Sequence, residues 1–131
     1  MRLALLGIAA FFLAAPSAEQ REPEWRTAVE QDILLHPFRY EPREIHLTAG
    51  RPVLLQFVND GQAWLSFQAP RFFASSQIRR DDRRRVLNGG FRLAPGARLR
   101  ISLVPARGQY QAYSGYLIQR LRGMTARIIV E

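Results

Sequence analysis

Short apolar or alternating stretches, separated by turn residues, constrain the fold of this chain more than any other feature. In residues 98–104, RLRISLV, Arg or Ser alternates with Leu and Ile, and residues 44–48 alternate in a similar way. A period of two is typical of a half-buried strand, and many short strands joined by regular turns predict an all-β, antiparallel sandwich. The chain has 131 residues, enough for one such domain with a hydrophobic core.

Residues 71–86 interrupt the strand pattern. They contain Phe72 and Phe73, followed by the charged run QIRRDDRRR. We predict a short helical excursion here. Because Asp81 and Asp82 interrupt the arginines, a solvated helix face is the expected role of this run.

The first eighteen residues have the pattern of a secretory signal. Arg2 precedes an apolar run at 3–15, and small residues follow it. The run has the length of a signal-peptide core and is shorter than the ~20 residues that span a bilayer. We therefore predict removal of 1–18, which leaves a leader segment at 19–29 and one domain at 30–131, in the periplasm or secreted. An uncleaved N-terminal anchor is the alternative.

Composition narrows the chemistry of the chain. The absence of cysteine excludes disulfides, thiolate metal sites and a cysteine nucleophile. No Ser-His-Asp set, paired-carboxylate motif, phosphate loop or HExxH motif occurs, so an enzyme is not expected.

The formal charge is +8 and all 19 basic residues are arginines, which bind carboxylates and phosphates in bidentate fashion. An acidic periplasmic protein or an anionic membrane surface fits an exported chain of this kind better than nucleic acid does.

The C-terminal stretch, 108–131, indicates a family. An aromatic strand with Tyr110 and Tyr113 is followed by a loop at 114–123, by Met124 and by the apolar run IIV. This outline resembles the C-terminal signature of cupredoxins, the blue-copper-type β-sandwiches. Residues 38–61, FRYEPREIHLTAGRPVLLQFVNDG, and 65–73, LSFQAPRFF, are similar to other segments of that family. The resemblance covers about 33–130 and implies a Greek-key sandwich, with electron transfer by bound copper in members that keep their ligands.

The resemblance also places the copper-ligand positions of the family on this chain. The first His position falls on Leu65, the Cys position on Ser114, the second His position on Gln119 and the axial Met position on Met124. Blue copper needs two imidazoles and a thiolate, with Met as a weak axial partner. The resemblance therefore implies a cupredoxin-like protein without type 1 copper or any other expected cofactor, acting as a binding or accessory module. A copper-binding electron carrier or a metal chaperone is the alternative.

The chaperone alternative would use His36 and His46, the only imidazoles of the chain, together with Met124. The opposing interpretation has His46 facing outward on an alternating strand, His36 in the bend at Pro37, and Met124 in the core. Metal titration separates the two.

A partner-binding face is predicted on the loop that rims the former copper end. Arg120 and Arg122 flank Gln119, and with Tyr116 and Leu121 they have the composition of interface hot spots. Four aromatic side chains are expected beside the emptied site: Trp64, Phe72, Phe73 and Tyr116. They either fill the space of the ligands or form a shallow apolar binding surface.

Overall fold

The computed structural model describes residues 7, 9, 10 and 22–131. The predicted signal segment therefore lies almost entirely outside the described residues. Within the described part of the chain, no helix has the length and apolar character needed to cross a bilayer. The first strand begins at Val29, one residue before the predicted start of the domain.

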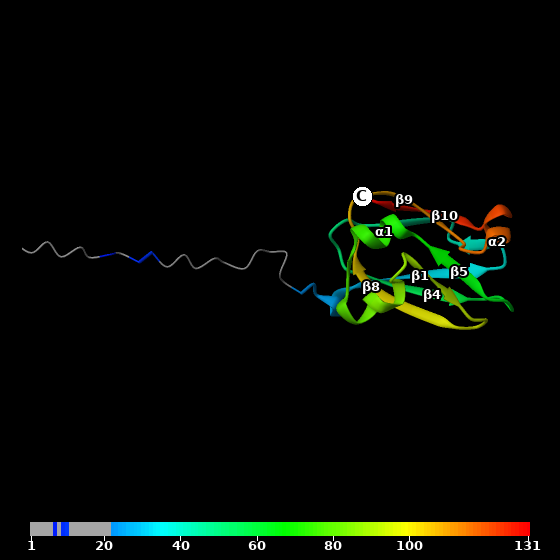
Figure 1. Ribbon diagram of the computed structural model, residues 1–131, viewed down its shortest axis with the longest axis horizontal. Helices are drawn as coiled ribbons and strands as arrows, with labels where there is room; N and C mark the ends of the chain where they lie inside the picture. Colours follow the sequence, from blue (N-terminus) through cyan, green and yellow to red (C-terminus); the bar gives the residue numbers. More distant parts are fainter. Residues whose placement is uncertain (1–6, 8, 11–21) are drawn as a thin grey trace, which may run out of the picture.

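Residues 29–130 form two five-stranded sheets that pack face to face (Figure 1). The first sheet has the order β2-β1-β4-β8-β6 and the second has the order β3-β10-β9-β5-β7. The strands of the first sheet are β1 Val29–His36, β2 Arg39–Glu41, β4 Val53–Asn59, β6 Gln77–Ile78 and β8 Arg98–Val104. Those of the second are β3 Glu44–Leu47, β5 Leu65–Gln68, β7 Gly90–Leu93, β9 Gly108–Tyr113 and β10 Thr125–Val130. The predicted all-β sandwich is confirmed.

The sheets are mixed, which corrects the expectation of purely antiparallel pairing. β1 pairs in parallel with β4, and β10 pairs in parallel with β3. Neighbouring strands can run in the same direction only when the chain crosses over between them. Here β3 lies in the opposite sheet, so the chain leaves the first sheet after β2 and returns to it as β4.

The helical excursion predicted at 71–86 is confirmed as α1, Pro70–Ser75, and the 3-10 helix η3, Arg80–Val86. The two-residue strand β6 separates them. The described part of the chain contains two further short helices, η2 at Trp25–Thr27 and α2 at Leu117–Leu121. Proline at the first position of α1 suits a helix start, because its missing N–H would have no partner there.

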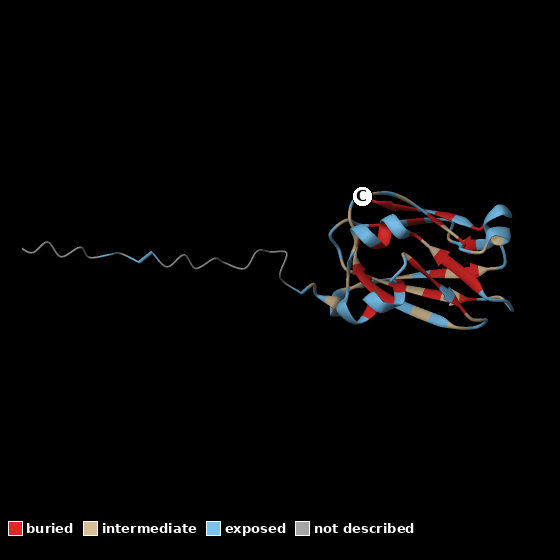
Figure 2. Cartoon of the chain, viewed as in Figure 1, coloured by how far each residue is buried: buried red, intermediate tan, exposed pale blue. Residues whose placement is uncertain are grey.

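The core lies between the two sheets, and Figure 2 shows the buried residues of the strands in red. Burial alternates along β4, so that Val53, Leu55 and Phe57 face inward. The ring centroid of Phe57 lies 4.9 Å from that of Phe67 and 4.7 Å from that of Phe91. Such tilted and edge-to-face aromatic contacts make a rigid core, and this core holds the loops at both ends of the sandwich.

The two ends of the sandwich differ. Residue 22 and η2 lie at one end (Figure 1). Trp25 lines a depression there together with Arg79, which precedes η3, and Arg85, which lies within it. The opposite end carries α2 (Figure 1). We call this opposite end the loop end. It comprises the β1–β2 turn at Phe38, residues 60–64 between β4 and β5, and residues 114–124 between β9 and β10.

Candidate functional site

Three of the four predicted ligand positions are joined by hydrogen bonds at the loop end. The Ser114 hydroxyl donates to Gln119 Oε1 at 2.7 Å. The backbone N–H of Ser114 donates to the Met124 carbonyl at 3.1 Å, and the N–H of Met124 donates to the Gln119 carbonyl at 3.1 Å. Ser114 and Met124 are fully buried and Gln119 is half-buried.

Leu65, the fourth position, opens β5 and is fully buried. The side-chain amide of Gln119 donates from Nε2 to the carbonyl of the preceding residue, Trp64, at 3.1 Å. This bond ties α2 to the start of β5. The structure thus brings the four residues into one neighbourhood, while their correspondence to copper ligands stays a prediction.

Sequence reasoning missed Ser66, which connects this neighbourhood to the core. Its hydroxyl accepts the backbone N–H of Gly115 at 3.0 Å, and its carbonyl accepts a hydrogen bond from the Tyr40 hydroxyl. Burial raises the pKa of the Tyr40 hydroxyl above its usual value, so this group stays protonated as a donor. The sequence showed only a serine between two apolar residues, Leu65 and Phe67. In the structure all three residues are buried in β5.

Sequence reasoning also missed Asn59, which holds the loop that presents Trp64. Its Nδ2 donates to the carbonyls of Ala63 and Leu93, at 2.9 Å each, and its Oδ1 accepts the N–H of Gly61 at 2.8 Å. Asn59 is buried at the end of β4. One side chain therefore fixes both the start and the end of the 60–64 loop.

The segment predicted as a loop at 114–123 contains a helical turn, which corrects that expectation. In α2 the N–H of Arg120 donates to the Tyr116 carbonyl at 3.0 Å, and the N–H of Arg122 donates to the Ile118 carbonyl at 3.1 Å. Gly123 follows with a φ of 94°, a left-handed conformation that ends helices. Five helical residues are too few to show a periodic pattern, and so short a helix depends on tertiary contacts.

An open apolar groove of about 560 Å³ lies over this neighbourhood. Its lining consists of Phe38, Trp64, Tyr116, Leu117, Ile118 and Gln119. Leu121, the last residue of α2, is also exposed. The groove contains Trp64 and Tyr116, two of the four aromatic residues that were expected here.

The other two aromatic residues lie elsewhere, so their expected position was wrong. Phe72 and Phe73 are buried on α1. Their ring centroids lie 5.5 Å from Tyr110 and 6.3 Å from Phe67, respectively. Both rings are buried on α1, which contacts β9 and lies away from α2 (Figure 1). They therefore cannot cover the loop end.

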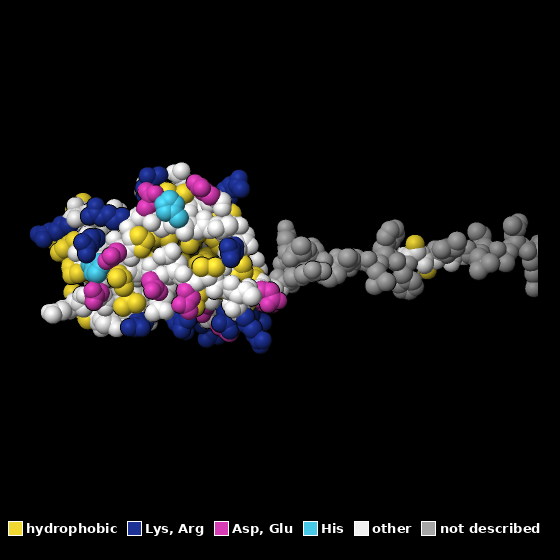
Figure 3. All heavy atoms as spheres, turned by 180° about the vertical axis from the view of Figure 1, so that it is seen from behind, with side chains coloured by type: hydrophobic (Ala, Val, Ile, Leu, Met, Phe, Trp, Pro, Cys, Tyr) yellow, Lys and Arg dark blue, Asp and Glu magenta, His cyan; other side chains and the backbone are white. Residues whose placement is uncertain are grey.

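Arginines stack on the aromatic rings of the loop end. The guanidinium carbon of Arg92 lies 5.0 Å from the ring centre of Tyr116. That of Arg120 lies 5.4 Å from the ring centre of Tyr113, and that of Arg122 lies 5.1 Å from the ring centre of Phe38. These distances suit cation–π contacts. Arg92, on β7, was missed because it is far from the loop in sequence. At the left of Figure 3, arginines adjoin apolar side chains at this end.

The side chains at the four positions do not fit type 1 copper. Leu65 has no donor atom, and the Ser114 hydroxyl is engaged with Gln119 and with the N–H of Tyr116 at 3.1 Å. Both ends of the Gln119 amide are also engaged. Met124 is the one soft donor, and a single thioether cannot replace two imidazoles and a thiolate. The polar atoms here satisfy one another without an ion.

The two histidines contact carboxylates in separate places. His36 Nε2 lies 2.7 Å from Glu41 Oε2, and its Nδ1 lies 3.4 Å from Asp60 Oδ2. His46 Nε2 lies 2.8 Å from Glu44 Oε1. Within residues 22–131, no three His, Cys, Asp or Glu side chains are arranged to hold a metal ion. The chaperone alternative would also need the buried Met124 to become accessible.

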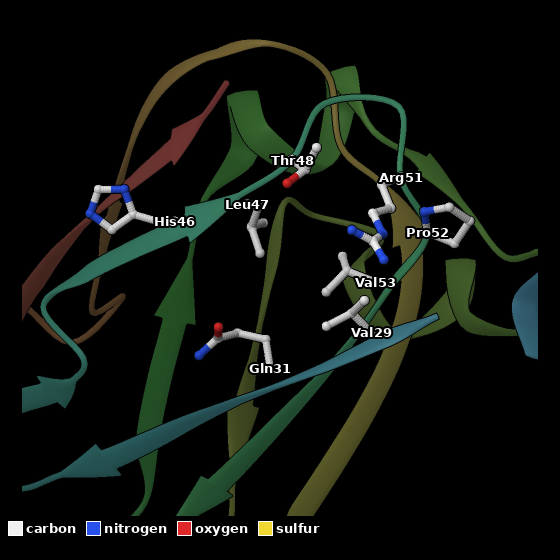
Figure 4. Close-up of a pocket in the computed structure, with 8 residues that line it drawn as sticks. All are labelled: Val29, Gln31, His46, Leu47, Thr48, Arg51, Pro52 and Val53. Carbon is white, nitrogen blue, oxygen red and sulfur yellow. The ribbon is translucent and has the colours of Figure 1, made fainter. Parts of the chain in front are cut away.

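A small depression of about 110 Å³ lies between the edges of the two sheets, beside β1 and β3 (Figure 4). Val29 and Val53 form its floor, with Arg51 directed toward them. The ring of His46 points away from this floor (Figure 4). The depression is small, and its lining mixes apolar side chains with Gln31, His46, Thr48 and Arg51.

Comparison with known proteins shows the fold. No protein-family model matches the chain, and no curated protein matches its sequence. The structure is similar to dithionite-reduced auracyanin from Roseiflexus castenholzii, with a TM-score of 0.57 and 17% identity over 79% of this chain and 98% of that chain. It is also similar to auracyanin A, a blue copper protein from Chloroflexus aurantiacus, with a TM-score of 0.56 and 12% identity over 79% and 99% of the two chains. Part of the McoA multicopper oxidase from Aquifex aeolicus matches with a TM-score of 0.64 and 14% identity, over 85% of this chain and 31% of that one. The predicted cupredoxin-like fold is confirmed.

Proposed function

We propose that this protein is an exported, periplasmic binding or accessory module that has a cupredoxin-like fold and no type 1 copper site, and that its loop end binds the partner. The observation that carries the proposal is the hydrogen-bonded closure of Ser114, Gln119 and the Trp64 carbonyl beneath an open apolar groove. At the positions where the family resemblance places copper ligands, the side chains of Leu65, Ser114 and Met124 are buried, and the polar atoms of Ser114 and Gln119 are hydrogen-bonded.

Electron transfer by copper is the alternative that the blue copper neighbour supports. A type 1 site depends on a copper–thiolate bond, and the chain has no cysteine. The four side chains also lack both imidazoles. Binding a partner through the surface of the sandwich requires neither a thiolate nor an imidazole.

Binding without catalysis fits the environment of Ser114. A serine nucleophile needs a neighbouring base that accepts its proton. The Ser114 hydroxyl donates instead to the neutral amide oxygen of Gln119, and it is fully buried. This hydroxyl therefore acts as a structural link between β9 and α2.

The loop end has the chemistry of a contact surface. Large exposed apolar side chains that form one patch mark interaction sites in soluble domains. Here Trp64, Leu117 and Ile118 line the groove, with Arg120 and Arg122 next to them. An acidic protein or an anionic membrane surface would complement the arginines and the net charge of +8.

Photo-cross-linking in cells tests the contact surface and requires no candidate partner. The photo-cross-linking residue p-benzoylphenylalanine replaces Ile118, and the control carries it in place of Leu87, which is also exposed but follows η3. We expect a specific protein or lipid adduct from position 118 that is absent from position 87. Adducts from position 87 alone, or from neither position, would contradict the proposal.

A metal titration tests the other half of the proposal. The purified protein should stay colourless with Cu(II), because no thiolate is present to give the intense charge-transfer band. Its Tm should not rise beyond the small effect of copper bound adventitiously by the two histidines. An intense blue copper complex of the unaltered chain would contradict the proposal whatever the cross-links show.

A further inference from the structure

We propose that the loop end docks on an anionic bilayer, with α2 and Trp64 entering the headgroup region and the neighbouring arginines binding lipid phosphates. This inference rests on the proposed function, in which the loop end is the contact surface. It assigns that surface to one class of partner. Four features of the described residues support it: protruding aliphatic side chains, a partly hydrogen-bonded backbone, a group of arginines and a separate basic face that lacks these features.

Aliphatic side chains protrude from α2. Leu117, Ile118 and Leu121 are 57%, 66% and 74% exposed, and Trp64 is 53% exposed beside them. Of the large exposed apolar residues in the described part of the chain, all but Val29 and Leu87 belong to the loop end. Leu and Ile side chains that stand out from a helical turn, together with Trp, are typical of surfaces that enter a membrane interface.

The backbone of α2 is partly hydrogen-bonded. The N–H groups of Arg120, Arg122 and Met124 donate to the carbonyls of Tyr116, Ile118 and Gln119, respectively. Free N–H and C=O groups are costly in an apolar medium, and a closed helical turn avoids part of that cost. A tip built in this way can leave water more readily than an irregular loop of the same composition.

Arginines surround the apolar tip. Arg92, Arg120 and Arg122 stack on Tyr116, Tyr113 and Phe38. All three arginines stay exposed, so their guanidinium groups remain open to lipid phosphates. None of the described residues that line the groove is acidic. The nearby carboxylates, Glu41 and Asp60, both contact His36. The charge offered at the tip is therefore positive.

A second basic face provides a control within the same molecule. Arg80 and Arg84 lie on η3, toward the end that holds residue 22, and η3 is opposite α2 (Figure 1). These arginines lack the stacked rings and the row of aliphatic side chains found at the loop end. If charge alone drove membrane binding, the η3 face would bind at least as well as the loop end.

The chain contains two tryptophans, Trp25 and Trp64, and they lie at opposite ends of the sandwich. In the Trp25→Phe variant, fluorescence therefore reports on the loop end alone. With vesicles of phosphatidylethanolamine and phosphatidylglycerol, we expect a blue shift of the emission and quenching by brominated lipid. Vesicles of pure phosphatidylcholine should give neither effect. Binding through any other part of the chain leaves the Trp64 emission unchanged.

Matched variants in this background separate the contributions. Leu117→Ser with Ile118→Ser should abolish the blue shift. Arg120→Gln with Arg122→Gln should weaken vesicle binding about 25-fold, because each arginine near an anionic surface contributes a factor of roughly five. It should also reduce the salt dependence. Arg80→Gln with Arg84→Gln removes the same charge from η3 and should leave the affinity within about twofold.

Three outcomes would overturn the inference. Vesicle binding that leaves the Trp64 emission unchanged and depends on Arg80 and Arg84 would place the contact on η3. Failure to bind vesicles, together with a specific protein adduct from position 118, would show that the loop end binds a protein, and the proposed function would stand. Failure to bind vesicles with no adduct from position 118 would remove both proposals.

Discussion

Restoring the copper ligands of the family tests the placement of four residues at once. The variant carries Leu65→His, Ser114→Cys and Gln119→His and keeps Met124. If the predicted correspondence is right, two imidazoles, a thiolate and a thioether converge at the loop end. Such a set binds Cu(II) as a blue or green type 1 site. Ser114 and Gln119 are hydrogen-bonded to each other, and Gln119 also donates to the carbonyl of Trp64, the residue before Leu65. The three altered residues therefore already lie in one neighbourhood.

The stability cost follows from the contacts that the variant loses. Replacing the buried Leu65 costs about 1–3 kcal/mol, from lost apolar burial and imperfect refilling. The other two changes remove the Ser114–Gln119 bond and the bond from Gln119 to the Trp64 carbonyl, at about 1 kcal/mol each. The apo variant should therefore be about 3–5 kcal/mol less stable. Single domains have about 5–15 kcal/mol of stability, so the variant should fold.

Copper should recover part of this loss. A ligand at about 100 times its Kd stabilises the folded state by about 2.7 kcal/mol, which corresponds to a Tm rise of roughly 10–20 °C for a domain of this size. Absorbance and electron paramagnetic resonance detect the copper–thiolate bond, and calorimetry measures the Tm with and without Cu(II). A folded triple variant that binds copper without a thiolate band would refute the assignment of these positions.

A matched control places the cysteine elsewhere. Ser102 is also buried, but it lies on β8 in the opposite sheet. Leu65→His and Gln119→His combined with Ser102→Cys should give no thiolate band. If the control variant turns blue, the copper site does not depend on the position of Ser114, and the reasoning fails.

Three further outcomes are expected. Mass spectrometry of protein purified from cells should show loss of about the first 18 residues, whereas an intact Met1 in a soluble cytoplasmic fraction would contradict export. Asn59→Ala should lower the free energy of unfolding in urea by about 2–3 kcal/mol, because it leaves the Leu93 and Ala63 carbonyls without their donor; a loss below about 0.5 kcal/mol would show that the loop does not depend on this side chain. Because burial raises the pKa of the Tyr40 hydroxyl, its contribution to stability is fully present below the unfolded tyrosine pKa of about 10 and falls as the pH rises above it. Tyr40→Phe should therefore flatten the loss of stability at alkaline pH, and equal slopes for both proteins in urea titrations would argue against the buried donor.

Local pattern was enough to predict the strands and the sandwich. The alternation in RLRISLV places β8 at Arg98–Val104, as the structure has it, because a strand turns alternate side chains to opposite faces wherever it lies. The absence of a thiolate is likewise a property of composition. The resemblance in 108–131 predicted the cupredoxin-like fold, which the structural comparisons confirm.

Only the tertiary structure decided the strand directions, the helical turn and the surface of the loop end. The parallel pairings of β1 with β4 and of β10 with β3 depend on where the intervening chain crosses between sheets. The form of α2 depends on Gln119, whose side chain is held by Ser114 and by the Trp64 carbonyl, which is distant in sequence. Hydropathy would bury Leu117 and Ile118, yet no strand or helix of the described chain lies over them and they stay exposed, while Phe72 and Phe73 turn inward on α1. Burial and hydrogen bonding between distant segments depend on contacts that a local sequence pattern does not contain.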